Sequence, residues 1–189
     1  MEATLPVTTQ LIQTRFGDAV LQTHRFRGDE TVVVKREAVH DVLQFVRDTA
    51  ELDMNFLMSV TFVDYLTFPQ NRPVGDYAGS ADARYEVVYH LYSLKKGHRL
   101  RVKAPVAAGE TVPTASDLWA SADWMEREAW EMYGVKFAGH PNLKRLLTHK
   151  DFVGHPLRKD FPLKKRQPLS ESDTLMDEME QRLRLKGLK

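Results

Sequence analysis

The chain has 189 residues, no cysteine, and a formal net charge of +1 from 27 Lys and Arg against 26 Asp and Glu. This length predicts one domain with an appendage, and the missing cysteine excludes thiolate-held iron–sulfur clusters, Cys-based zinc sites, Cys nucleophiles and disulfides. The sequence has no apolar run of about 18 residues that would predict a transmembrane helix. The first residues show no secretory-signal pattern, so we expect a protein made and kept in the cytoplasm.

Residues 1–104 predict an α+β domain. Helical spacing of apolar residues indicates the helices, and β-branched or alternating stretches indicate the strands. Helices are expected over residues 6–16 and 37–50, and strands over 20–26, 31–35, 56–68, 84–93 and 98–104. Two hairpins among these strands predict a mixed or antiparallel sheet of about five strands with helices on one face.

Some local patterns within this domain give sharper expectations. Gly17 is expected to end the first helix, and Gly28-Asp29 is expected to form the turn of the first hairpin. Residues 69–82 are rich in Pro, Gly, Asn and Asp and predict a mobile surface loop. Alternation in the third strand predicts one sheet face that receives the side chains of Phe56, Met58, Val60 and Phe62.

The chain changes character after residue 104. Residues 105–135 contain all three Trp residues and predict a connector followed by a short helix. Residues 136–169 predict a long extended basic arm, since residues 144–166 carry eight basic and two acidic side chains, a net charge of +6. Residues 170–189 predict a C-terminal helix with an apolar stripe, which docks on the body or on a neighbour.

Searches for motifs of catalysis and cofactor binding fail. The sequence contains no G-x-G-x-x-G, no P-loop, no G-x-S-x-G and no H-E-x-x-H. His140, His149 and His155 are metal ligands by type, but no acidic cluster adjoins them, so histidines bonded to backbone or carboxylate are favoured. We therefore predict no catalytic residue, no cofactor and no metal in this chain.

The segment 124–134 predicts a helix with a tryptophan on its charged face. Glu126, Arg127 and Glu131 lie on one arc, and Trp130 lies between the first two. A free-standing surface helix rarely has this arrangement, so we expect the arm or another protein to cover the face. Arg127 and Glu131 are four residues apart and can pair locally. The alternative is a clamp that fixes the arm or a neighbouring subunit.

Two patterns in the second half of the chain resemble the signatures of one family. The first consists of Glu126, Arg127, Glu128, Glu131, Met132, Tyr133, His140 and the run Lys144-Arg145-Leu146-Leu147. The second is Gly154-His155-Pro156-Leu157-Arg158-Lys159-Asp160-Phe161-Pro162. They resemble the complex I 30-kDa subunit family, whose bacterial members are the C subunits of the NADH–quinone oxidoreductase NDH-1. The resemblance spans nearly the whole chain and is strongest over residues 113–163.

The resemblance implies a scaffold role in a respiratory enzyme. That enzyme passes electrons from NADH through FMN and iron–sulfur clusters to quinone and pumps protons. The family subunit holds neither cofactor, so FMN and the clusters would belong to its partners. Those partners would be the 49-kDa-type subunit, the terminal-cluster subunit and other peripheral-arm subunits. The chain would lie on the cytoplasmic side of the inner membrane, attached only through the complex.

The same resemblance suggests which residues meet partners. We expect the arm to wrap a partner, bury Phe152 and Phe161 there, and pair Arg158 and Lys159 with partner carboxylates. His140 and His155 are expected to be turn histidines, each after a glycine of unusual φ or close approach. The full set of expected interface residues is Glu126, Arg127, Glu128, Trp130, Glu131, His140, Lys144, Arg145, His155, Arg158, Lys159 and Asp160.

Two alternatives stay open at this point. Related assemblies such as a membrane-bound hydrogenase or another donor's quinone reductase share the signature, so the motif does not exclude them. A nucleic-acid-binding module would explain the +6 strip. Against it, the strip has few aromatic residues for base stacking, and the sequence pI is only about 8.0.

Overall fold

The computed structural model describes all residues except 1–6, 68–82, 165–166, 168–170 and 188–189. The predicted loop 69–82 therefore lies outside the described residues. The helices are α1 (Val7–Phe16), α2 (Val39–Asp48), α3 (Ala120–Tyr133) and α4 (Glu171–Leu185), with 3₁₀ turns at Gly17–Ala19 and Arg36–Ala38. The strands are β1 (Val20–Phe26), β2 (Asp29–Val34), β3 (Phe56–Asp64), β4 (Tyr85–Ser93), β5 (His98–Val106), β6 (Thr111–Pro113) and β7 (Lys136–Ala138).

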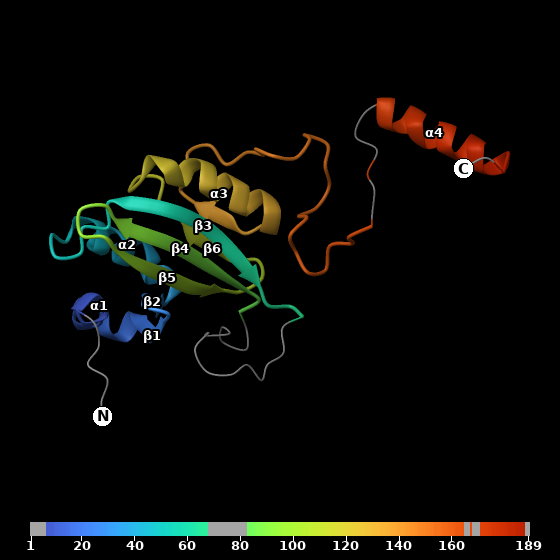
Figure 1. The fold of residues 1–189 in the computed structure, drawn as a ribbon. Helices are drawn as coiled ribbons and strands as arrows, with labels where there is room; N and C mark the ends of the chain where they lie inside the picture. The colour runs from blue at the N-terminus through green and yellow to red at the C-terminus, as the bar shows by residue number, and fades with distance from the viewer. Residues whose placement is uncertain (1–6, 68–82, 165–166, 168–170, 188–189) are drawn as a thin grey trace.

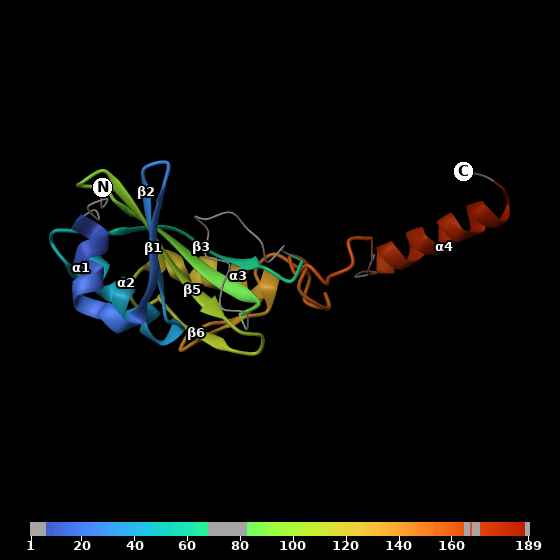
Figure 2. The same ribbon diagram turned by 90° about the horizontal axis from the view of Figure 1, so that it is seen from below.

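The five long strands form one mixed sheet in the order β1-β2-β5-β4-β3. The β1–β2, β4–β5 and β3–β4 pairs are antiparallel, while β2 and β5 run parallel. Apolar side chains from one face of this sheet share a single core with residues of three helices. These are Ile12 of α1, Ala129 of α3, and Val39, Val42, Leu43 and Val46 of α2. These findings confirm the predicted α+β class. Figures 1 and 2 show α4 projecting away from this body, beyond the arm that follows α3.

Three local expectations need correction. The first hairpin turns at Arg27 and Gly28, with φ of 52° and 95°, one residue earlier than predicted, because both central residues of such a turn need positive φ. Helix α1 ends at Phe16, directly before Gly17, as predicted, but Gly17 begins a 3₁₀ turn and does not adopt a left-handed capping conformation. The third strand carries an irregularity between Leu57 and Ser59, which shifts its register against β4.

That irregularity changes which side chains of β3 are buried. A bulge inserts one extra residue, so the alternation of faces before it is reversed relative to the alternation after it. Leu57 is therefore buried with Val60 and Phe62, while Phe56 and Met58 are 46% and 41% exposed. The prediction that Phe56 and Met58 share one face with Val60 and Phe62 was wrong for this reason.

The connector and the start of the arm also contain more structure than expected. Residues of β6 and β7 pair in parallel, with Val112 opposite Phe137. The predicted extended arm over 136–169 thus begins with a short strand. Phe137 is buried and lies 5.7 Å from Phe62 of β3, measured between ring centroids. This contact ties the end of α3 to the main sheet.

Candidate functional site

The charged face of α3 is the centre of the candidate site. Glu126, Arg127 and Glu131 are 0%, 7% and 1% exposed, although all three are charged by type. This burial confirms that the face is covered, as the position of Trp130 in the sequence predicts. The cover comes from this same chain, namely the connector before α3 and the arm after it. Among the described residues, Arg127 and Glu131 do not pair with each other but bind the arm separately.

Glu131 holds three consecutive residues of the arm. Its Oε2 accepts the N–H groups of Leu146 and Leu147, both at 2.8 Å. Its Oε1 accepts the N–H of Thr148 at 2.7 Å and also the hydroxyl of that residue. Burial alone would raise the pKa of Glu131, but these hydrogen bonds outweigh burial and lower it to about 2. The carboxylate is therefore ionised at neutral pH and fixes the arm through its backbone.

Arg127 binds the residues just before that segment. Its Nε donates to the carbonyl oxygen of Lys144 at 3.0 Å, and its Nη2 donates to that of Arg145 at 3.2 Å. The guanidinium also lies 5.3 Å from the ring centroid of Trp124, a cation–π distance. Arg127 thus binds backbone carbonyl groups, and Glu131 binds backbone N–H groups, of the continuous stretch 144–148. We call these two residues the arm clamp.

A second contact between arm and helix lies at the C-terminal end of α3. The last four carbonyl groups of a helix lack intrahelical donors and need other partners when they are buried. The donors here are Gly134 N–H to Trp130 O (2.7 Å), His155 Nδ1 to Glu131 O (2.8 Å), Leu157 N–H to Met132 O (3.1 Å) and Arg158 Nε to Tyr133 O (2.5 Å). The arm therefore caps α3, and the cation of Arg158 also suits the negative end of the helix dipole.

Gly134 makes this cap sterically possible. Its φ is 79°, in the left-handed region that favours glycine. A Cβ added there would lie 2.2 Å from the Arg158 guanidinium and 2.6 Å from the His155 ring. The position thus requires glycine for two reasons, backbone conformation and close approach.

A third attachment joins the arm to the end of the sheet. Arg84 donates to Asp64 at 3.1 and 2.8 Å and to Asp160 at 3.0 and 2.8 Å. Asp64 also accepts the backbone N–H of Lys159 at 2.9 Å. Burial raises the pKa of Asp64, but the bonds from Arg84 and from backbone N–H groups lower it overall. These residues are far apart in sequence, so no local spacing indicates the network, and sequence reasoning missed it.

Glu126 binds the connector rather than the arm. Its two carboxyl oxygens accept the N–H of Ala115 at 2.6 Å and the hydroxyl of Thr114 at 2.5 Å. Here burial outweighs the hydrogen bonds and raises the pKa of Glu126 to about 7. Burial also raises the pKa of Tyr89 well above its ordinary value, with a smaller contribution from the nearby Glu126. Glu126 therefore titrates in the neutral range inside the core.

The two histidines of the Gly-His-Pro triplets serve as turn residues, as expected. His140 Nδ1 accepts the N–H of Asn142 at 3.0 Å, and its Nε2 lies 3.1 Å from the Asp123 carbonyl oxygen. His155 lies on the helix cap described above, and burial there lowers its pKa. Their preceding glycines have positive φ, 82° at Gly139 and 100° at Gly154.

Several predicted contacts of the arm with a partner are instead made within this chain. Phe152 and Phe161 stack on each other at 5.9 Å and are half-buried against their own chain. The guanidinium of Arg158 is occupied by the α3 cap, and the carboxylate of Asp160 by Arg84. The open end of α3 and the sheet end thus supply intramolecular partners for Arg158 and Asp160, and the expected contacts of the arm with another subunit stay predictions. Other residues of the predicted set keep exposed side chains, namely Glu128, Lys144 and Lys159.

Two other structural features are absent from the described part of the chain. No group of three or more His, Asp or Glu side chains there is arranged to hold a metal ion. No helix among those residues has the length and hydropathy that crossing a membrane requires.

The protein is thus a small α+β domain whose C-terminal arm is fastened to α3 by the buried arm clamp of Arg127 and Glu131. The chain belongs to the family described as respiratory-chain NADH dehydrogenase, 30 Kd subunit, whose model matches residues 32–167.

Individual relatives agree with this membership. The C subunit of the NADH-quinone oxidoreductase of Citrifermentans bemidjiense is 46% identical over 153 residues, which is 80% of this chain and 86% of that protein. The combined C/D subunit of the NADH-quinone oxidoreductase of Bdellovibrio bacteriovorus is 42% identical over 145 residues, 77% of this chain but only 23% of that longer protein.

A solved structure shows the same fold. A chain from the membrane-bound sulfane sulfur reductase (MBS), an archaeal respiratory membrane complex, superposes with a TM-score of 0.64 and 21% identity. The match covers 82% of this chain and 84% of that one.

Proposed function

We propose that this chain is the 30-kDa-type scaffold subunit of a proton-translocating NADH–quinone oxidoreductase and performs no catalysis by itself. In this proposal FMN and the iron–sulfur clusters are held by partner subunits, and the chain organises the peripheral arm of the enzyme on the cytoplasmic side of the membrane. Its family and the name of its relative from Citrifermentans bemidjiense support the assignment to this enzyme.

The observation that carries the scaffold role is the two-sided character of the arm. Its inner side is bound to α3 and to the sheet end through the contacts described above. Its outer side exposes four large apolar side chains, Leu147 (61%), Val153 (73%), Leu157 (50%) and Leu163 (98%). Exposed lysines lie among them in the sequence, at positions 144, 150, 159 and 164. Apolar anchors with a charged rim are typical of protein–protein interfaces.

The tail gives a second unpartnered apolar surface. In α4, Leu175, Met176, Met179 and Leu183 are each 43% to 60% exposed. Such a stripe is suited to a groove on another protein. We propose the 49-kDa-type subunit and the terminal-cluster subunit as the proteins that cover the outer arm and α4. In this proposal the 49-kDa-type subunit is the D subunit of the enzyme, and the combined C/D subunit of the Bdellovibrio bacteriovorus relative supports it as a neighbour.

The basic strip is better explained by this role than by nucleic-acid binding. Two of its arginines are occupied inside the chain, since Arg145 donates to Thr148 at 2.8 Å and Arg158 caps α3. A phosphate-binding strip would need these guanidinium groups to be free. We infer that the strip exists to fasten the arm and to place lysines at a protein interface.

The test is purification of the tagged chain from detergent-solubilised membranes of its own cells. Wild type is expected to bring the 49-kDa-type and terminal-cluster subunits with stoichiometric iron, and the electron-input subunit among the co-purified proteins identifies the donor. Val153→Asp, on the outer arm, is expected to lower this yield at least fivefold, whereas Leu21→Asp, a 41% exposed residue of β1, is expected to leave it unchanged. Recovery of no iron–sulfur subunit with wild type would overturn the proposal.

A further inference from the structure

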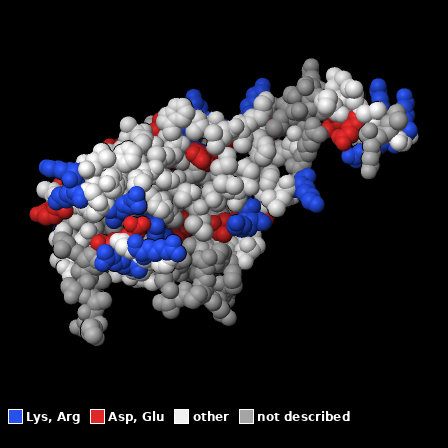
Figure 3. All heavy atoms as spheres, viewed as in Figure 1, with Lys and Arg blue, Asp and Glu red and all other residues white. Residues whose placement is uncertain are grey.

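A second exposed surface lies on the sheet face opposite the helices. The core-facing residues of β5, Leu100 and Val102, alternate with Arg99 and Arg101, so these two arginines point to the other face. Figure 3 shows basic side chains gathered over this part of the sheet, with some acidic ones among them. The surface lies where the β1–β2 and β4–β5 hairpins turn. We call it the hairpin-end patch and define it by Phe26, Phe56, Met58, Tyr92, Arg99 and Arg101.

Strand register brings these residues together. Arg99 is opposite Tyr92 on β4, and Tyr92 is opposite Phe56 on β3. One step along the strands, Arg101 is opposite His90 on one side, and opposite Thr31 of β2 on the other. The bulge in β3 adds Met58 to the same surface, which explains why a strand residue of this size is exposed. The patch is therefore continuous across four strands.

Among the described residues its side chains have few polar partners, of which one is the Thr31 hydroxyl that accepts from Arg101 at 3.2 Å. Phe26, Phe56 and Met58 are 58%, 46% and 41% exposed. Arg99 lies 6.0 Å from the ring centroid of Tyr92, and Arg27 lies 5.1 Å from that of Phe26. Within the part of the chain that the structure describes, no ion pair is formed by Arg27, Arg99 or Arg101. Arginine, aromatic residues and methionine together are the composition enriched at protein–protein interfaces.

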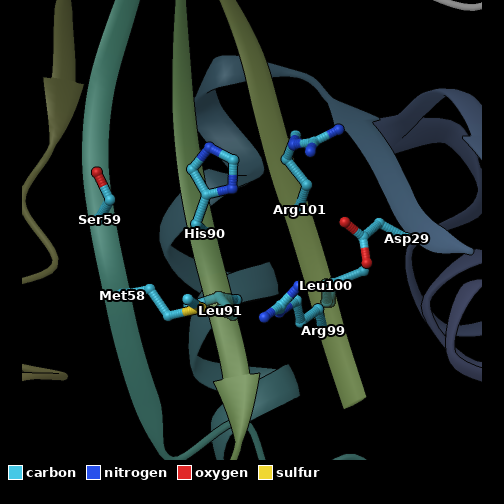
Figure 4. A pocket seen from close by; sticks show the side chains of 8 residues that line it. All are labelled: Asp29, Met58, Ser59, His90, Leu91, Arg99, Leu100 and Arg101. Atoms are coloured by element: carbon cyan, nitrogen blue, oxygen red, sulfur yellow. The ribbon is translucent and has the colours of Figure 1, made fainter. Parts of the chain in front are cut away.

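The patch is hollowed at its centre. Ser59, His90 and Arg101 lie side by side on three neighbouring strands, and Met58, Arg99 and Asp29 surround them (Figure 4). Two arginines, Arg99 and Arg101, and a single carboxylate, that of Asp29, line the hollow, and burial together with the charge of Arg101 lowers the pKa of His90. The hollow thus favours a negatively charged group next to an apolar one.

We propose that the hairpin-end patch docks an acidic protein segment with an apolar side chain, supplied by a neighbouring subunit other than the one on the arm. Its carboxylates bind Arg99 and Arg101, and its apolar side chain packs on Met58 and Phe56. A protein is favoured over nucleic acid because the patch has too few cations for the many phosphate contacts that nucleic-acid binding uses, and because exposed Phe56 and Met58 are typical of protein interfaces. The inference rests on the proposed function insofar as the neighbour belongs to the same complex.

The location of the patch separates it from the arm. The arm reaches the sheet at Asp64 and Arg84, at the end of β3 and just before the start of β4. The patch lies at the opposite ends of these strands, with Phe56 beginning β3 and Tyr92 near the end of β4. One chain therefore presents two binding surfaces at opposite ends of its sheet, as a protein that bridges two neighbours would.

Photo-crosslinking in native membranes tests this proposal. A benzophenone amino acid is placed at Met58 in the patch, at Leu157 on the arm, and at Leu21 as a control with the same 41% exposure as Met58. The expected result is a Met58 adduct with an acidic segment of a protein different from the one in the Leu157 adduct, and no adduct at Leu21. Arg99→Glu is expected to lower the Met58 adduct about tenfold, and Arg15→Glu on α1 to leave it unchanged.

Each contrary result has a distinct meaning. Adducts at Leu157 without one at Met58 would overturn the patch proposal and leave the scaffold role intact. A Met58 adduct with nucleic acid, or equal adducts at Met58 and Leu21, would also overturn the patch proposal. The absence of adducts at both Leu157 and Met58 would overturn the scaffold role as well.

Discussion

Removing the charge of Glu131 should release the arm without unfolding the body. In Glu131→Gln the amide oxygen can still accept hydrogen bonds from the arm. The amide NH₂ group takes the place of the second oxygen and cannot accept the N–H groups that this oxygen binds in wild type. A pKa lowered from 4.5 to about 2 corresponds to about 3 kcal/mol of stabilisation of the charged form. The free energy of local opening at residues 146–148 should fall by this amount, and that of the sheet should not change.

Hydrogen exchange measures this opening directly. The amides of Leu146, Leu147 and Thr148 are expected to exchange about 100-fold faster in Glu131→Gln than in wild type, while β4 amides keep their protection. Glu128→Gln is the matched control, because Glu128 lies on the same helix and is exposed. Unchanged protection at 146–148, or equal loss in both variants, would refute the clamp.

The lowered pKa of Glu131 predicts that the arm loses its attachment to α3 in acid. A folded-state pKa below the unfolded value gives stability that is fully present above about pH 4.5 and is lost as pH falls toward about 2. Wild-type arm amides should therefore lose protection over this range, and those of Glu131→Gln should show no such step.

Three further predictions concern the core, the cap and the sheet end. Because the folded pKa of Glu126 is raised to about 7, wild-type stability should fall as pH rises from about 4.5 through 7, by about 3 kcal/mol at most. Urea unfolding of Glu126→Gln should lack this fall, and an identical pH profile would contradict the assignment. Gly134→Ala should cost at least about 2 kcal/mol, more than Gly28→Ala, where only positive φ is violated; equal costs would contradict the close approach. Asp64→Asn should cost more than Asp160→Asn, whose half-exposed ion pair contributes about 1 kcal/mol or less, and the reverse order in thermal unfolding would refute the ranking.

The sequence predicted what local periodicity determines. The stripe of α2, Val39 to Val46, is buried as its spacing requires, and both predicted hairpins are present. The charged face of α3 was correctly expected to be covered, because Trp130 is costly to place among solvated charges.

The errors come from effects that local spacing does not encode. A bulge at Met58 adds one residue to β3 and leaves no signature in the composition. The sequence pattern therefore assigned Phe56 and Met58 to the wrong face of the sheet. The Asp64–Arg84–Asp160 network joins residues distant in sequence. The arm or another protein was expected to cover the charged face of α3, but capping of the helix end by the arm was not predicted. The four carbonyl groups at the end of α3 need donors, however, and the arm supplies three of them.

The proposed scaffold role means that this chain contributes to assembly of the complex and not to its chemistry. The direct measurement is quinone-reductase activity per assembled complex in cells that carry only Leu157→Asp, an outer-arm variant, compared with wild type. We expect assembled complex and total NADH–quinone activity to fall by the same factor, so that activity per complex is unchanged. A fully assembled complex with reduced activity would contradict the scaffold account and assign this chain a part in the reaction.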